Sequence, residues 1–112
     1  MDSYFLREDL AHFSAGLLGE DNKELWDQFL TYYGTATSPG ALDGKTKKLI
    51  ALAIALSHHC PYCIEAYTTA CVEAGFEKAE LAEVLHLVAS MSAGMALVNG
   101  VQMKRLEDKI SL

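Results

Sequence analysis

The chain has 112 residues, the length of a single domain, and 51% of them are hydrophobic. Its formal net charge is −6 and its longest basic run is Lys47-Lys48, so neither nucleic acid nor an anionic membrane is expected as a partner. A domain this small buries only part of its apolar surface by itself. We therefore expect some of that surface to lie between identical subunits.

The start of the chain does not resemble a secretory signal, because Met1–Tyr4 is followed within five residues by three charged side chains. The longest uninterrupted apolar run, 49–56, is far shorter than the about 20 residues that span a bilayer. The longer segment 84–98 is interrupted by polar residues. These features favour a cytoplasmic protein with one domain, residues 1–112.

Apolar residues recur mostly at helical spacing, and no segment alternates as a strand would. The chain is therefore expected to be all-α, with about six helices. Gly19 and Gly75 are expected to end two of them, Asp43 to cap another, and the Gly- and Thr-rich stretch 34–44 to be a connector. The expected helices are 6–18, 23–33, 45–58, 61–75 and 78–98, with a short charged helix after Gly100.

Two of the three cysteines form a C-x-x-C motif, Cys60 to Cys63. Pro61 suits the first position of a helix, which puts Cys60 at the N-cap, where unpaired N–H groups and the positive end of the helix dipole stabilise an anion. Cys63 then lies one turn further along, within disulfide reach at roughly 5–6 Å between Cα atoms. We expect Cys60 to be the attacking thiol and Cys63 the resolving thiol of a redox pair.

Two other interpretations of the motif remain open. His58, His59, Cys60 and Cys63 offer enough nitrogen and sulfur ligands for zinc, although a structural zinc site usually takes a second, well-separated ligand pair. The cysteines can also be small packing groups. Cys71, two turns beyond the motif at about 12 Å of helix rise, is too far away to bridge and is expected in a core or interface.

His58 and His59 end the apolar helix just before the thiols. Either one is placed to deprotonate Cys60, because imidazole titrates near neutral pH. Both are equally suited to cap the C-terminal end of the helix, where cations are favoured.

The stretch from "GALDGKTKKLI" through "CPYCIEAYT" to "GFEKAELAEV" resembles the carboxymuconolactone decarboxylase/alkylhydroperoxidase D-like superfamily. Within it the likeness is greatest to peroxidase-like proteins associated with arsenosugar biosynthesis, through "CPYCIEAYT" and "LVNGVQM". The resemblance implies an all-helical fold, assembly into homotrimers or homohexamers, and a thiol–disulfide activity of peroxiredoxin type.

The chain departs from the hydroperoxidase pattern at the proton relay. The pattern has a Glu twelve residues before the first cysteine, where this chain has Lys48. It has histidines where this chain has Tyr62 and Tyr67. Two consequences are open: either the relay is rebuilt from His58 or His59 with Tyr62 and Tyr67, or the activity is weak. In a rebuilt relay tyrosine acts as a hydrogen-bond donor, since its usual pKa is about 10.

These observations predict a thiol-dependent peroxidase or disulfide oxidoreductase without cofactor or metal, whose partners are a small peroxide, or a protein disulfide, and a thiol donor. One alternative is a non-redox member of the superfamily acting on a small organic acid or lactone, with Lys48 or His86 touching the substrate. Another is a helical module without catalysis, with or without zinc.

Overall fold

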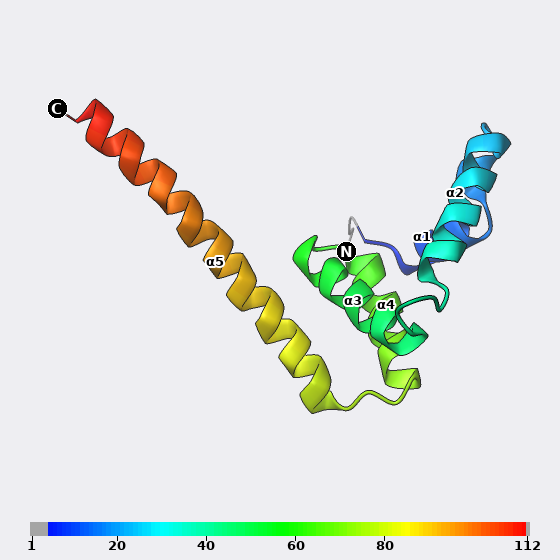
Figure 1. The fold of residues 1–112 in the computed structure, drawn as a ribbon. Helices are drawn as coiled ribbons and strands as arrows, with labels where there is room; N and C mark the ends of the chain where they lie inside the picture. Colours follow the sequence, from blue (N-terminus) through cyan, green and yellow to red (C-terminus); the bar gives the residue numbers. More distant parts are fainter. Residues whose placement is uncertain (1–4, 112) are drawn as a thin grey trace.

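The computed structural model describes residues 5–111, which form five α-helices and one short 3₁₀ turn (Figure 1). No strand occurs in this range, so the predicted all-α class is confirmed. Met1–Tyr4, on which the expectation about a secretory signal rests, lies outside the described residues. The elements are α1 (Arg7–Ser14), η1 (Leu17–Gly19), α2 (Lys23–Thr37), α3 (Gly44–Ser57), α4 (Pro61–Glu73) and α5 (Lys78–Ile110).

Side-chain caps place the starts of α2, α3 and α4. Asn22 accepts the Leu25 N–H at the start of α2, and Asp43 accepts the Thr46 N–H at 2.7 Å at the start of α3. Cys60 is the N-cap of α4, as predicted. Each cap satisfies a backbone N–H that the first turn of a helix cannot pair internally.

The first expected helix is interrupted. Gly16 adopts φ +90°, in the left-handed region that ends a helix, and the chain continues as η1. Gly19 then lies against Trp26 so closely that an added Cβ would stand 2.6 Å from the indole ring. The chain therefore turns back onto α2 at a point where only glycine fits.

Helix α2 runs four residues beyond its predicted end because its last carbonyls find side-chain donors. Ser38 Oγ donates to the Gly34 carbonyl at 2.6 Å. Lys47, from α3, donates to the carbonyl oxygens of Ala36 at 2.8 Å and of Ser38 at 2.5 Å. A cation at a helix C-terminus also favours the dipole, and this one comes from a neighbouring helix.

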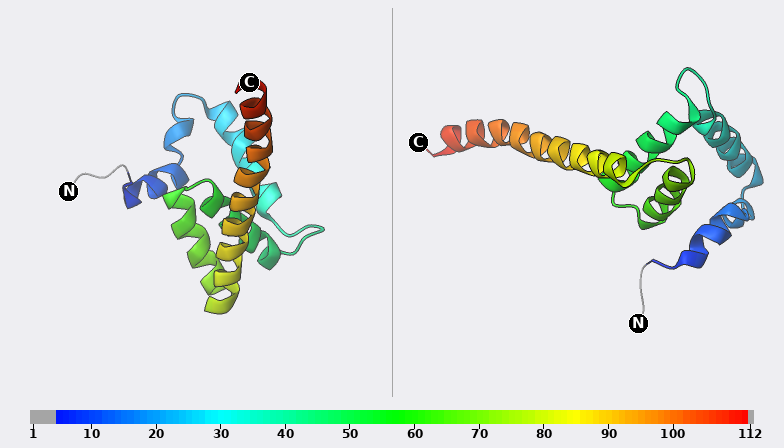
Figure 2. Two further views of the ribbon diagram at one scale, coloured as in Figure 1. Left: turned by 90° about the vertical axis from the view of Figure 1, so that its left-hand side faces the viewer. Right: turned by 90° about the horizontal axis from the view of Figure 1, so that it is seen from below.

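The small core lies between α3 and α4, which form a helical hairpin (Figures 1 and 2). Leu52 and Ala55 of α3 and Cys71 of α4 are its buried residues. The alanine-rich stretch of α3 allows close approach, with α4 on one side and the first turns of α5 on another. This hairpin fixes the turn that carries the C-x-x-C motif.

Helix α5 is a single helix of 33 residues, where a break at Gly100 was expected. Its length, about 50 Å at 1.5 Å per residue, carries it away from the hairpin (Figures 1 and 2). It presents an apolar seam, Leu87, Met91, Val98 and Val101, in which each residue is more than half exposed.

The apolar part of α5 is also long enough to cross a membrane by length and composition, with a mean hydropathy of 1.7 over 18 residues and none of that window buried. The radius of gyration is 19.0 Å, against about 13 Å for a compact domain of this length. Much of the apolar surface of the chain is thus not covered by other parts of the same chain.

Candidate active site

The C-x-x-C motif begins in the turn between α3 and α4. His58 is the C-cap of α3, and His59 takes φ +55°, a left-handed conformation that reverses the chain. The Cys60 N–H then donates to the Ala55 carbonyl, and Pro61 begins α4. This turn places the Cys60 sulfur over the N-terminal end of α4, where backbone N–H groups point outward.

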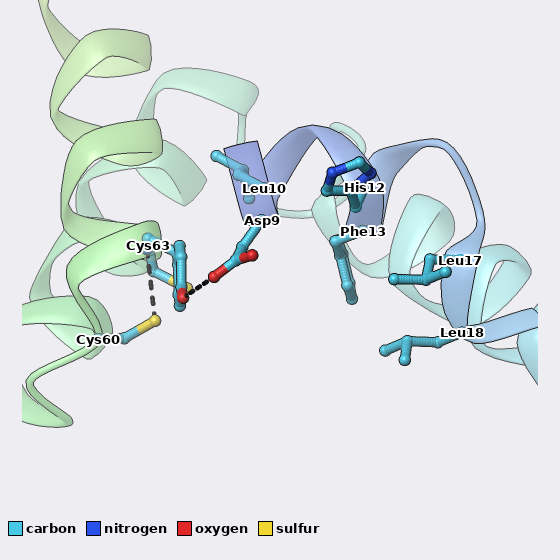
Figure 3. Close-up of a pocket in the computed structure, with 9 residues that line it drawn as sticks. Asp9, Leu10, His12, Phe13, Leu17, Leu18, Cys60 and Cys63 are labelled. Atoms are coloured by element: carbon cyan, nitrogen blue, oxygen red, sulfur yellow. Dashed lines mark hydrogen bonds between the residues drawn. The ribbon is translucent and has the colours of Figure 1, made fainter. Parts of the chain in front are cut away.

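The Cys60 sulfur is stabilised as an anion. The Cys63 thiol and the Cys63 backbone N–H both hydrogen-bond it, the latter at 3.3 Å, and together they lower the pKa of Cys60 (Figure 3). Cys60 is only half-buried, and it lines a pocket. This is the position and the direction of pKa shift that an attacking thiol requires.

The neighbouring thiol is shifted the other way. Hydrogen bonding to the Cys60 sulfur, and secondarily burial, raises the pKa of Cys63 to about 11. Both cysteines are free thiols in this structure. When the pair loses one of its two thiol protons, the negative charge is therefore favoured on Cys60 and the remaining proton on Cys63.

The N-terminal segment reaches the first turn of α4 through three contacts. The Tyr62 hydroxyl donates to the Asp9 carboxylate at 2.6 Å, which raises the pKa of Tyr62. The rings of Phe5 and Tyr62 lie 4.7 Å apart, and Arg7 pairs with Glu65 at 3.1 Å. Asp9 was not among the predicted site residues, since nothing in the spacing relates it to a motif 51 residues away.

A pocket of about 430 Å³ lies between α1, η1 and the dithiol (Figure 3). Cys60, Tyr62 and Cys63 form one wall. The opposite wall is mostly apolar and consists of Asp9, Leu10, His12, Phe13, Leu17 and Leu18. The thiols therefore face a space whose other wall is mostly hydrocarbon.

Tyr67 lies one turn beyond Cys63 and hydrogen-bonds Tyr33 of α2 through the two hydroxyl groups. Burial, and then this hydrogen bond, raises the pKa of Tyr67. Its hydroxyl is thus held protonated and directed to α2. Tyr33 was not predicted as a site residue, and its apolar helix face was the only signal in the sequence.

The two predicted histidines are both exposed. Among the described residues neither imidazole hydrogen-bonds Cys60, and the histidine that lines the pocket is His12, on the α1 side away from the sulfurs (Figure 3). His58 is the C-cap of α3, which is the second of the two roles expected for it from the sequence. A role for His58 or His59 as a base stays a prediction.

Cys71 and Lys48 lie apart from the pocket. Cys71 is fully buried, and burial raises its pKa, while the Lys48 ammonium acts in the opposite direction. The predicted core position of Cys71 is confirmed. His86 is exposed on α5. Within residues 5–111 no three His, Cys, Asp or Glu side chains are grouped to hold a metal ion.

Comparison with known proteins gives matches of three kinds: a family model, a curated relative and a solved structure. Residues 23–103 match the model of the carboxymuconolactone decarboxylase family. The chain is 31% identical over 100 residues to "Uncharacterized protein 4 in cox locus" of Paracoccus denitrificans, covering 87% of this chain and 90% of that protein.

The third match is a crystal structure of a carboxymuconolactone decarboxylase family protein from Legionella pneumophila. It superposes with a TM-score of 0.67 at 29% identity, over 95% of this chain and 94% of the other. The expected likeness to the arsenosugar-associated proteins stays a prediction.

Proposed function

Because this chain belongs to the carboxymuconolactone decarboxylase family, which includes both peroxidase-like and decarboxylase members, we propose that its dithiol makes it a thiol-dependent peroxidase or disulfide oxidoreductase of peroxiredoxin type. The observation that carries the proposal is the unequal thiol pair. Cys60 caps a helix N-terminus with a lowered pKa, and Cys63 is one turn away with a raised one.

The oxidation of the pair by a hydroperoxide takes two steps. The Cys60 thiolate attacks the terminal oxygen of R–O–O–H, the O–O bond breaks, and the leaving alkoxide takes a proton from solvent to become an alcohol. Cys63 then attacks the Cys60 sulfenic acid. The S–O bond breaks, hydroxide leaves with the Cys63 proton as water, and a Cys60–Cys63 disulfide forms.

A thiol donor returns the pair to its reduced form by two thiol–disulfide exchanges. A protein disulfide can serve as the oxidant in place of the peroxide. Cys60 then attacks one of the two sulfur atoms of that disulfide. With either oxidant, the thiol donor then attacks the Cys63 sulfur of the Cys60–Cys63 disulfide. The lowered pKa of Cys60 makes its sulfur the better leaving group in this step.

The tyrosines at the relay positions are suited to donate hydrogen bonds and not to act as bases. Both Tyr62 and Tyr67 have raised pKa values and stay neutral near pH 7. Each hydroxyl already has a partner, Asp9 for Tyr62 and Tyr33 for Tyr67. We propose that they position the first turns of α4 and that proton exchange at the sulfurs runs mainly through solvent.

Thiol counting tests this function. The fully reduced protein has three thiols, and one equivalent of hydroperoxide should leave one, Cys71. Cys60→Ser should abolish peroxide consumption, whereas the matched variant Cys71→Ser should retain it. Undiminished consumption by Cys60→Ser would refute the proposal, and turnover of a lactone acid that survives loss of both pocket thiols would favour the decarboxylase-like alternative.

We further propose that the protein works as a homo-oligomer, a trimer or hexamer, in the cytoplasm, without nucleic acid or membrane as partner. Its accessible surface is 8,988 Å². A compact monomer of 12.2 kDa exposes about 6,100 Å². The difference, about 2,900 Å², is more than three times the roughly 800 Å² that one partner of a standard interface buries.

A further inference from the structure

Aromatic side chains lie in contact along one face of α2. Trp26, Phe29 and Tyr33 share this face, because residues three, four and seven positions apart return to the same side of a helix. The ring centroids of Trp26 and Phe29 are 5.4 Å apart, and those of Phe29 and Tyr33 are 5.5 Å apart. A single phenyl ring therefore separates the two oxidisable rings of this face, the indole and the phenol.

The contacts continue from α2 to the dithiol helix through two hydroxyl groups. Tyr33 and Tyr67 share a hydrogen bond. Tyr67 in turn lies four residues beyond Cys63 on the same face of α4, about 6 Å along the helix. We call these four side chains the aromatic series: Trp26, Phe29, Tyr33 and Tyr67. The series joins α2 to the dithiol and takes no part in the attack of Cys60 on a peroxide.

The order of the side chains in the series matches the order in which they are oxidised by radicals. A tryptophanyl radical is a stronger oxidant than a tyrosyl radical, so an electron vacancy moves from Trp26 to the tyrosines. A dithiol that holds its negative charge on Cys60, with Cys63 one turn away, is oxidised further because its two sulfurs can share the unpaired electron. The sulfurs are therefore the end of the series.

We propose that the aromatic series carries single oxidising equivalents from Trp26 to the Cys60–Cys63 pair, which gives the protein a second activity, the reduction of oxidising free radicals such as alkoxyl radicals. Trp26 is the only tryptophan of the chain and is partly exposed, so it is the point of entry. This activity uses the dithiol of the proposed peroxidase but needs neither a bound peroxide nor attack by Cys60 on oxygen.

Each transfer along the series moves one electron and one proton. An alkoxyl radical takes an electron from Trp26 and the proton that the indole N–H releases, and it leaves as an alcohol. Tyr33 then reduces the Trp26 radical. The indole regains its proton from solvent, and Tyr33 loses its hydroxyl proton to solvent. The Tyr67 hydroxyl next gives its hydrogen atom to the Tyr33 oxygen along their shared hydrogen bond, so one O–H bond breaks and another forms.

The dithiol completes the reaction. The pair gives one electron to the Tyr67 radical, the Cys63 proton restores the Tyr67 hydroxyl by way of solvent, and the two sulfurs join as a disulfide radical anion. This anion gives its unpaired electron to a second alkoxyl radical, which takes a proton from solvent and becomes an alcohol. Two radicals are thus reduced, and the Cys60–Cys63 disulfide remains for a thiol donor to reduce.

Pulse radiolysis tests the transfer along the series. Azide radicals oxidise tryptophan preferentially, and tryptophanyl and tyrosyl radicals absorb in separate visible bands. In the full-length Cys60→Ser/Cys63→Ser variant, where no dithiol reduces the tyrosyl radical, the first band should be replaced by the second with a first-order rate constant that does not depend on protein concentration. Adding Tyr33→Phe should remove this phase. Adding Tyr32→Phe, a matched change at a residue that is 77% exposed and outside the series, should keep it.

A second measurement follows the oxidising equivalents to the thiols. Illumination of tris(bipyridine)ruthenium(II) with a cobalt(III) ammine quencher generates a one-electron oxidant without any peroxide. The wild type and Tyr32→Phe should form the Cys60–Cys63 disulfide with equal yield per oxidant. Tyr33→Phe and Tyr67→Phe should each give a smaller yield, with their helical circular dichroism retained.

The outcomes separate the radical activity from the peroxidase. Equal tyrosyl growth, or equal disulfide yields, in Tyr33→Phe and Tyr32→Phe would overturn the proposal and leave the peroxidase function standing, because neither measurement contains a hydroperoxide. A transfer that depends on Tyr33, in a protein that consumes no hydroperoxide, would support the radical activity and refute the peroxidase.

Discussion

A single lysine on the apolar seam of α5 should dissociate the protein. Met91 is 58% exposed in the isolated chain, so Met91→Lys should change the stability of one subunit by no more than about 0.5 kcal/mol. In an oligomer that covers the seam, the ammonium group loses its water, which costs about 3 kcal/mol or more per interface. The subunit dissociation constant should then rise by at least about 100-fold.

Sedimentation velocity and light scattering measure this directly. The wild type should have a mass that is a multiple of 12.2 kDa, and Met91→Lys a mass shifted toward one subunit with its helical circular dichroism retained. Asp108→Lys, on a part of α5 that already carries charge, is the control and should stay assembled. A wild type that sediments as a single subunit would refute the reasoning. A wild type that stays in solution only with detergent would also refute it, because the apolar stretch of α5 is long enough to cross a membrane.

Three further predictions concern the thiols and the helix contacts. Iodoacetamide should label Cys60 before Cys63 as the pH is raised, because the pKa of Cys60 is lowered while that of Cys63 is about 11; peptide mass spectrometry that finds Cys63 labelled first contradicts the proposed pair. Cys71→Ser should lower the free energy of unfolding in urea by about 1–3 kcal/mol, since it buries a hydroxyl in a site with no exposure, and an unchanged midpoint would speak against the described core. Tyr33→Phe should cost about 1 kcal/mol by removing the hydroxyl partner of Tyr67, and it should cost nothing in a Tyr67→Phe background if the two act only through their shared bond.

The local features of the active site were predictable because they are encoded in adjacent residues. Proline at the first position of α4 and a cysteine before it determine both the helix start and the placement of a sulfur at its N-terminus. The spacing of two residues then puts Cys63 one turn away. The Asp43 cap and the Gly75 stop follow the same local rules, and both were located correctly.

Element lengths were less predictable where distant groups stabilise them. Lys47 satisfies carbonyl groups at the end of α2 from another helix, which lets α2 continue into the expected connector. Gly100 does not stop α5, because nothing in the structure needs a left-handed residue there and a single glycine costs a helix interior only about 1 kcal/mol.

The helical class, the helix starts and the position of the dithiol follow from the amino-acid sequence alone, since each depends on hydrogen bonds between neighbours in the chain. The packing of the helices, by contrast, brings Asp9 to Tyr62 and Tyr33 to Tyr67, in contacts between residues 53 and 34 positions apart. The same packing leaves the apolar seam of α5 uncovered. Such long-range contacts depend on how the helices pack against one another. The spacing of residues along the chain does not predict which distant side chain will lie opposite a given one.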